Sequence, residues 1–127
     1  MRWRWLIPLV AALVVFGGCV TPSIPIPPPS AELMEFHITG EPGSTVATFS
    51  YPANKNYEES IVFVYNRIRG VGIIEAAHPD GSVGPTAPVA ATTGDEIVVS
   101  FQRDDQTVST CIRLREGAQS PTDYCGP

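Results

Sequence analysis

The chain has 127 residues, of which 43% are hydrophobic and 17% are charged, and its formal net charge is −5. This composition excludes an acidic disordered polymer, and the negative charge offers no basic surface for nucleic acid. Thirteen prolines and eleven glycines argue against long helices and for turns and extended segments.

Residues 1–18 have the pattern of a signal peptide. Arg2 and Arg4 precede an apolar run from Leu6 to Phe16, which is followed by two glycines and Cys19. A run of about 11 residues is too short to cross a bilayer as a helix, which needs about 20. The segment is therefore predicted to be an export signal, and an uncleaved anchor helix is the alternative.

The end of this segment, Phe16-Gly17-Gly18-Cys19, resembles the lipobox of bacterial lipoproteins, with Phe16 at the usual leucine position. The resemblance implies cleavage before Cys19, a covalent lipid on that cysteine and a membrane anchor in the cell envelope. Val20, where aspartate would favour retention, implies the outer membrane if the source has two membranes. An ordinary secretory cut near Cys19 is the alternative.

Residues 19–30 are predicted to be the lipidated cysteine followed by a proline-rich linker. Five of the eleven residues from Val20 to Ser30 are proline. Proline favours polyproline II, which rises about 3.1 Å per residue, so we expect a stiff spacer of roughly 30 Å. Pro25 and Pro28 also satisfy a P-x-x-P pattern, so a ligand for an SH3-like module is the alternative.

Residues 31–127 are predicted to form one all-β domain, a two-sheet antiparallel sandwich. Short segments rich in Val, Ile, Thr, Phe and Tyr alternate with turn signals such as Asp80-Gly81. The predicted strands are Glu32–Thr39, Ser44–Tyr51, Ile61–Ile68, Val71–Ala77, Val83–Ala91, Glu96–Arg103 and Thr107–Arg115.

Alternation along these strands predicts which side chains point into the core. Three sets each share one face: Met34, Phe36 and Ile38; Ile97, Val99 and Phe101; and Val108, Thr110, Ile112 and Leu114. In the third strand Ile61, Phe63 and Tyr65 are predicted to face the core, with Val62 and Val64 behind them.

Several turn motifs follow one another in a characteristic order: Phe36-His37-Ile38-Thr39-Gly40, Pro42-Gly43-Ser44, Asp80-Gly81-Ser82, Gly94-Asp95-Glu96-Ile97 and Arg103-Asp104. This order resembles bacterial Ig-like domains of secreted and surface proteins. The resemblance implies a seven-stranded Ig-like sandwich used for spacing, adhesion or protein contact, usually without catalysis. It implies no catalytic residue.

The cysteines predict a disulfide. With Cys19 lipidated, Cys111 and Cys125 remain as a pair in an exported protein. Cys111 lies between two core-facing residues, so its side chain is predicted to point outward, where the tail after Glu116 folds back to reach it. Two free thiols are the alternative. No histidine lies at ligand spacing to these cysteines, so zinc is not predicted.

The sequence contains none of the common catalytic or nucleotide-binding motifs, such as G-x-S-x-G, H-E-x-x-H or a P-loop. We therefore predict that the protein is not an enzyme and holds no cofactor besides the lipid.

One loop is a candidate partner-contact surface. It carries Tyr51, Asn54, Lys55, Asn56 and Tyr57. Tyrosine and asparagine on loops held by a rigid sandwich are favoured for recognition.

Acidic residues at the same end of the sandwich are a candidate calcium site. Glu58 and Glu59 are expected to approach Asp104 and Asp105. Calcium requires six to eight oxygen ligands, so a solvated acidic rim is the alternative.

The sequence as a whole predicts a membrane-anchored, non-catalytic lipoprotein that presents a small Ig-like domain to an envelope or surface protein, or that serves envelope structure. Binding of a small ligand or calcium at the acidic end is the alternative function. Nucleic acid is not a predicted partner.

Overall fold

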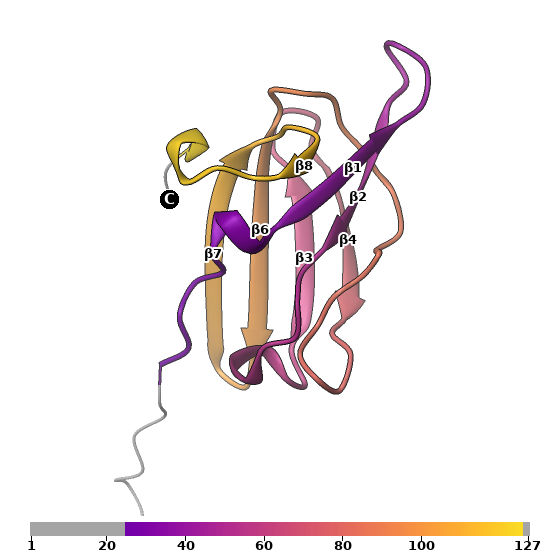
Figure 1. The fold of residues 1–127 in the computed structure, drawn as a ribbon. Coiled ribbons are helices and arrows are strands. Elements are labelled where there is room, and N and C mark those ends of the chain that lie inside the picture. Colours follow the sequence, from indigo (N-terminus) through magenta and orange to yellow (C-terminus); the bar gives the residue numbers. More distant parts are fainter. Residues whose placement is uncertain (1–24, 126–127) are drawn as a thin grey trace, which may run out of the picture.

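The computed structural model of the protein describes residues 25–125, which form two antiparallel β-sheets packed face to face (Figure 1). The predicted signal peptide, Cys19 and the first part of the linker lie outside the described residues. The elements in chain order are the 3-10 turn η2 (Ala31–Leu33), β1 (Glu35–Thr39), β2 (Val46–Ser50), the 3-10 turn η3 (Lys55–Tyr57), β3 (Ile61–Asn66), β4 (Val71–Ala76), β5 (Val89–Ala90), β6 (Glu96–Arg103), β7 (Gln106–Arg113), β8 (Gly117–Ala118) and the 3-10 turn η4 (Pro121–Asp123). Within residues 25–125, no helix has the length and apolar character needed to span a bilayer.

The two sheets have four strands each, in the orders β5-β2-β1-β8 and β4-β3-β6-β7. The predicted all-β sandwich is therefore confirmed, with eight strands instead of about seven. The strand predicted over Val83–Ala91 is wrong for most of its length, because only β5 and an isolated bridge from Tyr51 to Val83 are paired. Pro85 and Pro88 lie in this segment and have no N–H to donate to a strand ladder.

The core lies between the sheets and agrees with most of the predicted faces. Phe36, Ile97 and Ile112 are fully buried, as are Met34, Val99 and Phe101, whereas Ile38 and Val108 at the strand ends are partly buried. The prediction for β3 is wrong, because Val62 and Val64 are 1% and 0% exposed whereas Ile61 and Tyr65 are 43% and 44% exposed. Both faces of β3 are apolar, so alternation alone does not indicate which face is buried.

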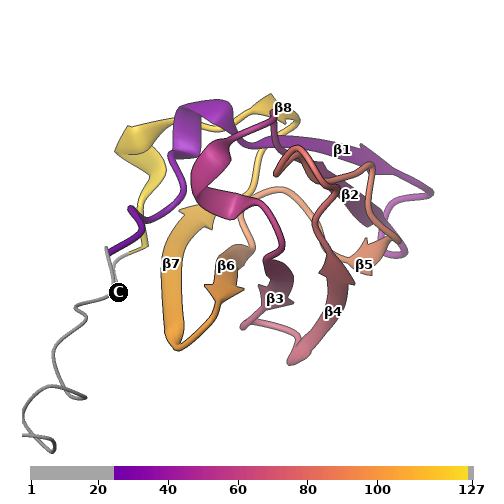
Figure 2. The same cartoon turned by 90° about the horizontal axis from the view of Figure 1, so that it is seen from below.

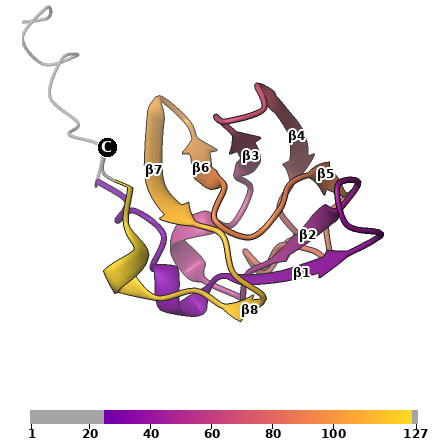
Figure 3. The same cartoon turned by 90° about the horizontal axis from the view of Figure 1, so that it is seen from above.

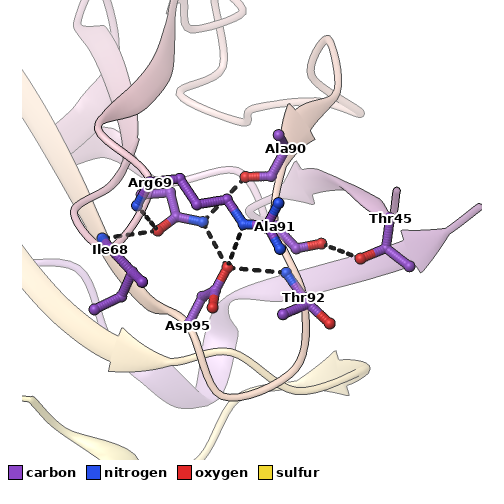
Figure 4. Close-up of polar contacts among 8 residues, drawn as sticks. Thr45, Ile68, Arg69, Ala90, Ala91, Thr92 and Asp95 are labelled. Atoms are coloured by element: carbon purple, nitrogen blue, oxygen red, sulfur yellow. Dashed lines mark hydrogen bonds and ion pairs between the residues drawn. The ribbon is translucent and has the colours of Figure 1, made fainter. Parts of the chain in front are cut away.

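Asn66, at the end of β3, and Asp95, just before β6, form a buried polar junction. Figure 4 shows Asp95 with its neighbours Arg69, Ala90 and Thr92. The Asn66 Nδ2 atom donates to Asp95 Oδ2 at 2.8 Å and to the Ala90 carbonyl at 3.0 Å. Asp95 Oδ2 also accepts from Arg69 Nε at 3.1 Å and from the Thr92 N–H at 3.0 Å. The junction ties the β3–β4 hairpin to the loop before β6, and it explains why Asn66 is buried in phase with Val62 and Val64.

The charge of Asp95 is stabilised by these donors. Burial opposes ionisation of the carboxyl, but the hydrogen bonds from Asn66, Thr92 and Arg69 outweigh it and hold the pKa of Asp95 below its usual range. Asp95 is therefore a carboxylate at neutral pH in a nearly closed environment.

The second half of the predicted linker packs on the domain. Ile26 N–H donates to Gln106 Oε1 at 2.8 Å, Tyr57 Oη donates to the Pro27 carbonyl at 2.7 Å, and Thr110 Oγ1 donates to the Pro29 carbonyl at 2.6 Å. This segment (residues 25–30, indigo in Figure 1) runs beside β7. Ile26, Pro27 and Pro29 of the predicted linker are therefore hydrogen-bonded to the domain.

The C-terminal tail covers two sheet edges. β8 pairs with the edge of β1, and the tail then returns to β7, where Tyr124 bridges Ile112. Cys111 and Cys125 are joined by the predicted disulfide, with Cα atoms 5.2 Å apart. Arg113 and Arg67 donate to the carbonyls of Tyr124 and Cys125.

Glu116, at the start of the C-terminal tail, is hydrogen-bonded to β1. Glu116 accepts from the Ile38 N–H at 2.9 Å and contacts His37 Nδ1 at 3.0 Å. The hydrogen bond from Ile38 and the neighbouring His37 hold the pKa of Glu116 below its usual range.

We expect Tyr57→Phe to lower the free energy of unfolding by about 1 kcal/mol, because the Pro27 carbonyl loses its donor. Urea denaturation measures the change. Tyr65→Phe is the matched control, since Tyr65 lies on the exposed side of β3. An equal effect of both substitutions would contradict the assigned role of the Tyr57 hydroxyl.

Candidate functional site: an apolar outer sheet face

The outer side of the second sheet carries a group of exposed and half-buried apolar side chains that we name the apolar face. In the antiparallel register, Ile74 lies beside Phe63, Gly72 lies beside Tyr65, and Ala76 lies beside Ile61. Tyr65 pairs in turn with Val98 of β6. The apolar face consists of Ile61, Phe63, Tyr65, Ile74, Ala76 and Val98.

No described segment covers the apolar face. Viewed along the strands, β1, β2 and β8 pack on the inner side of this sheet and the outer side is free of other ribbon (Figures 2 and 3). Ile74 is 67% exposed, the largest value among the exposed large hydrophobic residues in the described chain. Isolated apolar side chains on a surface are ordinary, but a contiguous group on one sheet marks an interaction site.

A shallow hollow of about 260 Å³ lies within the apolar face, lined by Phe63, Tyr65, Gly72, Ile74 and neighbouring backbone. Gly72 allows the Tyr65 ring to lie across it, since a Cβ atom at Gly72 would lie 3.2 Å from Tyr65 Cδ1 and 2.6 Å from the Val64 carbonyl oxygen. The hollow lies beside this ring, with Phe63 and Ile74 among its lining residues.

The outer side of the other sheet has a different character. Its exposed β1 residues are Glu35, His37 and Thr39, and the β2 residues beside them are Ser50, Thr48 and Val46. The apolar side chains of the second sheet's outer side are concentrated on β3 and β4, whereas Ser100, Gln102, Thr107 and Ser109 extend the same side over β6 and β7. The contiguous apolar group on β3 and β4 is the feature that marks a candidate interaction site.

Charges of opposite sign lie at the two ends of the apolar face. The end at the β3–β4 hairpin, which we name the arginine end, has Arg67, Arg69 and Arg113 against the carboxylates of Asp95 and Glu96. The opposite end, which we name the acidic end, has Glu58, Glu59, Asp104 and Asp105 against Lys55 and Arg103. The antiparallel pairing of β3 with β6 places these loops at one end, because Ile61 lies opposite Gln102.

The predicted partner-contact loop does not present its aromatic rings. Tyr51 and Tyr57 are 4% and 1% exposed, so the prediction of a tyrosine surface is wrong. The Tyr57 ring stacks on Phe101 with ring centroids 4.0 Å apart, and its Oη bonds the docked N-terminal segment. Burial, with the neighbouring Tyr51 adding to it, raises the pKa of Tyr57, so its hydroxyl stays a neutral donor.

The rest of that loop is polar and locally bonded. Asn54 Oδ1 accepts from the Asn56 N–H at 2.9 Å and caps η3, while Lys55 and Asn56 are exposed. Arg103 donates to the Lys55 carbonyl at 3.1 Å and to the Asn56 carbonyl at 3.3 Å. The loop is thus fixed to β6, as the predicted shared end of the sandwich requires.

The acidic residues of the predicted calcium site do not form a ligand cluster. In the part of the chain that the structure describes, no group of three or more His, Cys, Asp or Glu side chains lies in a position to hold a metal ion. Glu58, Glu59, Asp104 and Asp105 share one end but form a charged rim.

The apolar face was not predicted, because the alternation in β3 placed Ile61, Phe63 and Tyr65 in the core. A usable signal was present, since β3 carries more apolar residues than one buried face needs and Gly72 interrupts the next strand. No family model, curated protein or solved structure matches this chain, so the residues themselves are the basis for assigning a function.

Proposed function

We propose that this protein is a lipid-anchored, non-catalytic lipoprotein of the cell envelope that binds a protein partner through the apolar face of an Ig-like domain. The lipobox resemblance at Cys19 supports the anchor, and Val20 supports the outer membrane where there are two membranes. The observation that carries the contact role is the contiguous apolar group on the outer side of β3 and β4, where Ile61, Tyr65 and Ile74 are exposed.

The anchor is tested on the full-length protein in its own membranes. Metabolic labelling with an alkynyl fatty acid should label the wild-type chain, and Cys19→Ser should abolish the label and release the protein from the membrane fraction. Retention of Cys19→Ser in the membrane would contradict the lipid anchor.

The contact role is tested with a photoactivatable side chain in place of Ile74. Irradiation of intact cells should yield one discrete adduct of higher mass, because Ile74 stands furthest out of the apolar face. The control replaces Thr39, which is exposed on the polar side of the sandwich. Equal labelling from the two positions, or none from Ile74, would overturn the proposal.

A further inference from the structure

We infer that the occupant of the apolar face is a second copy of this chain, packed face to face with its strands antiparallel and the two-fold axis running across the strands. This inference rests on the proposed contact function and names its partner. Three features of the described residues support it: the shape of the face, the charges at its ends and the place where the chain leaves the domain.

The shape of the apolar face is self-complementary in this arrangement. Sheets that pack face to face lie about 10 Å apart with their strands roughly aligned. An axis across the strands, halfway between the Ile74–Phe63 row and the Gly72–Tyr65 row, turns each row onto the other. Ile74 of each copy then enters the hollow at Gly72 of the other, and Phe63 meets the second copy's Tyr65.

The charges favour the antiparallel arrangement over the parallel one. An axis across the strands places the arginine end of one copy over the acidic end of the other. Because β7 then lies over the second copy's β7, Arg113 lies over the second copy's Thr107, and Asp105 lies two residues, about 6.6 Å, further toward the β6–β7 turn. An axis along the strands would instead place acidic end on acidic end, which costs several kcal/mol in a close interface.

The exit of the chain also agrees with this axis. The N-terminal segment runs beside β7, fixed by the bonds to Tyr57, Thr110 and Gln106. A two-fold axis that runs across the strands, from β4 to β7, keeps the β7 sides of both copies on the same side of the dimer. Two lipids on Cys19 therefore reach one membrane without crossing the interface.

The size of the face predicts a weak dimer. With strands about 4.8 Å apart and about 3.3 Å per residue, the whole outer side of the sheet, four strands of about six residues, covers roughly 400 Å² in plan, and the apolar face is part of it. Stable interfaces bury about 800 Å² on each partner. The dimer is therefore expected to form at the membrane and to dissociate on dilution of the detergent-extracted protein.

The test is cysteine crosslinking of the full-length lipoprotein in its native membranes. Ser109 is exposed near the centre of β7, in the same row as Phe63 and Ser100. Ser109→Cys with a short bismaleimide should give a species of twice the mass, whereas Thr39→Cys on the polar side should not.

Adding Ile74→Lys to Ser109→Cys should lower the crosslinked fraction about tenfold or more, because the interface would bury an unpaired ammonium. The matched control is Leu33→Lys, which changes an exposed apolar residue in η2, outside the apolar face. Both variants are checked by thermal melting, and exposed positions of this kind should leave the melting temperature unchanged.

A charge swap tests the direction of packing. Arg113→Glu should weaken the crosslink, and Arg113→Glu with Asp105→Arg should restore it, because each copy then presents the exchanged pair. Loss of the Arg113 bond to the Tyr124 carbonyl would not be rescued by a change at Asp105.

The outcomes separate the inference from the proposed function. A crosslinked dimer that Ile74→Lys abolishes and the charge swap rescues supports both. An adduct from Ile74 whose mass differs from that of a second copy keeps the contact function and overturns the dimer. No crosslink from either Ile74 or Ser109 overturns both, and a dimer insensitive to Ile74→Lys places the interface elsewhere.

Discussion

Asp95→Ala should lower the free energy of unfolding by about 3 kcal/mol, one of the two largest effects we expect for a change in this protein. The substitution leaves one of the two Asn66 Nδ2 hydrogens and the Thr92 N–H without an acceptor, and it removes the carboxylate that holds Arg69, while the bond from Asn66 to the Ala90 carbonyl remains. Asn66 is fully buried, so the N–H that loses its acceptor cannot form a hydrogen bond with water instead. Equilibrium urea denaturation measures the loss.

Glu35→Ala is the control, because it removes the same charge from an exposed position on β1. It should change the stability by less than about 0.5 kcal/mol. Similar losses in the two variants would mean that net charge, and not the buried junction, determines the effect.

The contribution of Asp95 should depend on pH in one direction. The pKa of Asp95 is lower in the folded protein than in the unfolded chain, so its stabilisation is fully present above the unfolded value of about 3.9 and is lost as the pH falls through the folded value. The stability gap between wild type and Asp95→Asn should therefore narrow from pH 7 toward pH 3.

Removal of residues 25–30 should cost about 3 kcal/mol, which makes this the second large effect. A chain that begins at Ala31 loses the carbonyl that accepts from the buried Thr110 hydroxyl, the bond from Tyr57 Oη and the buried Pro29 ring. It also loses the bond from the Ser30 N–H to Tyr51 Oη, which is 3.0 Å long. The comparison is with a chain that begins at Pro25, by thermal and urea denaturation.

If residues 25–30 were only a spacer between the domain and the anchor, their removal would not lower the free energy of unfolding. Equal urea midpoints for the two chains would therefore show that residues 25–30 do not stabilise the domain. Thr110→Val in the longer chain is the matched control, since it removes the hydroxyl but keeps the volume, and it should account for only part of the loss.

The sheet architecture was predictable because most strands have one apolar and one polar face. β6 is an example, since Ile97, Val99 and Phe101 alternate with smaller or polar residues and are all buried. β3 offered no such contrast. Its orientation follows from Asn66, whose burial depends on Asp95 and Ala90, residues far away in the sequence.

The predicted exposure of the contact loop and the predicted spacer role of the proline-rich segment were wrong for related reasons. Tyr51 and Tyr57 stand among polar residues, which is typical of an exposed loop, yet both rings complete an aromatic row with Phe101. Pro27 and Pro29 were predicted to be part of a spacer because a proline-rich composition predicts an extended backbone. Composition does not indicate which residues that backbone packs against. Both errors concern long-range contacts, which local patterns do not contain. The acidic and polar loops, in contrast, do share one end as predicted, because hairpin topology determines that placement.

The packing of the N-terminal segment against β7 has a consequence for behaviour at a surface. Only residues 20–24 separate Cys19 from the docked chain, and a fully extended stretch of that length spans at most about 20 Å. An anchored domain would therefore be confined to a thin layer above the lipid, where neighbouring copies meet at an effective concentration set by the short tether. An affinity between copies that is too weak to detect in dilute solution would suffice there. The number of molecules per unit area of membrane, and not their total number in the cell, would then determine the fraction that is dimeric.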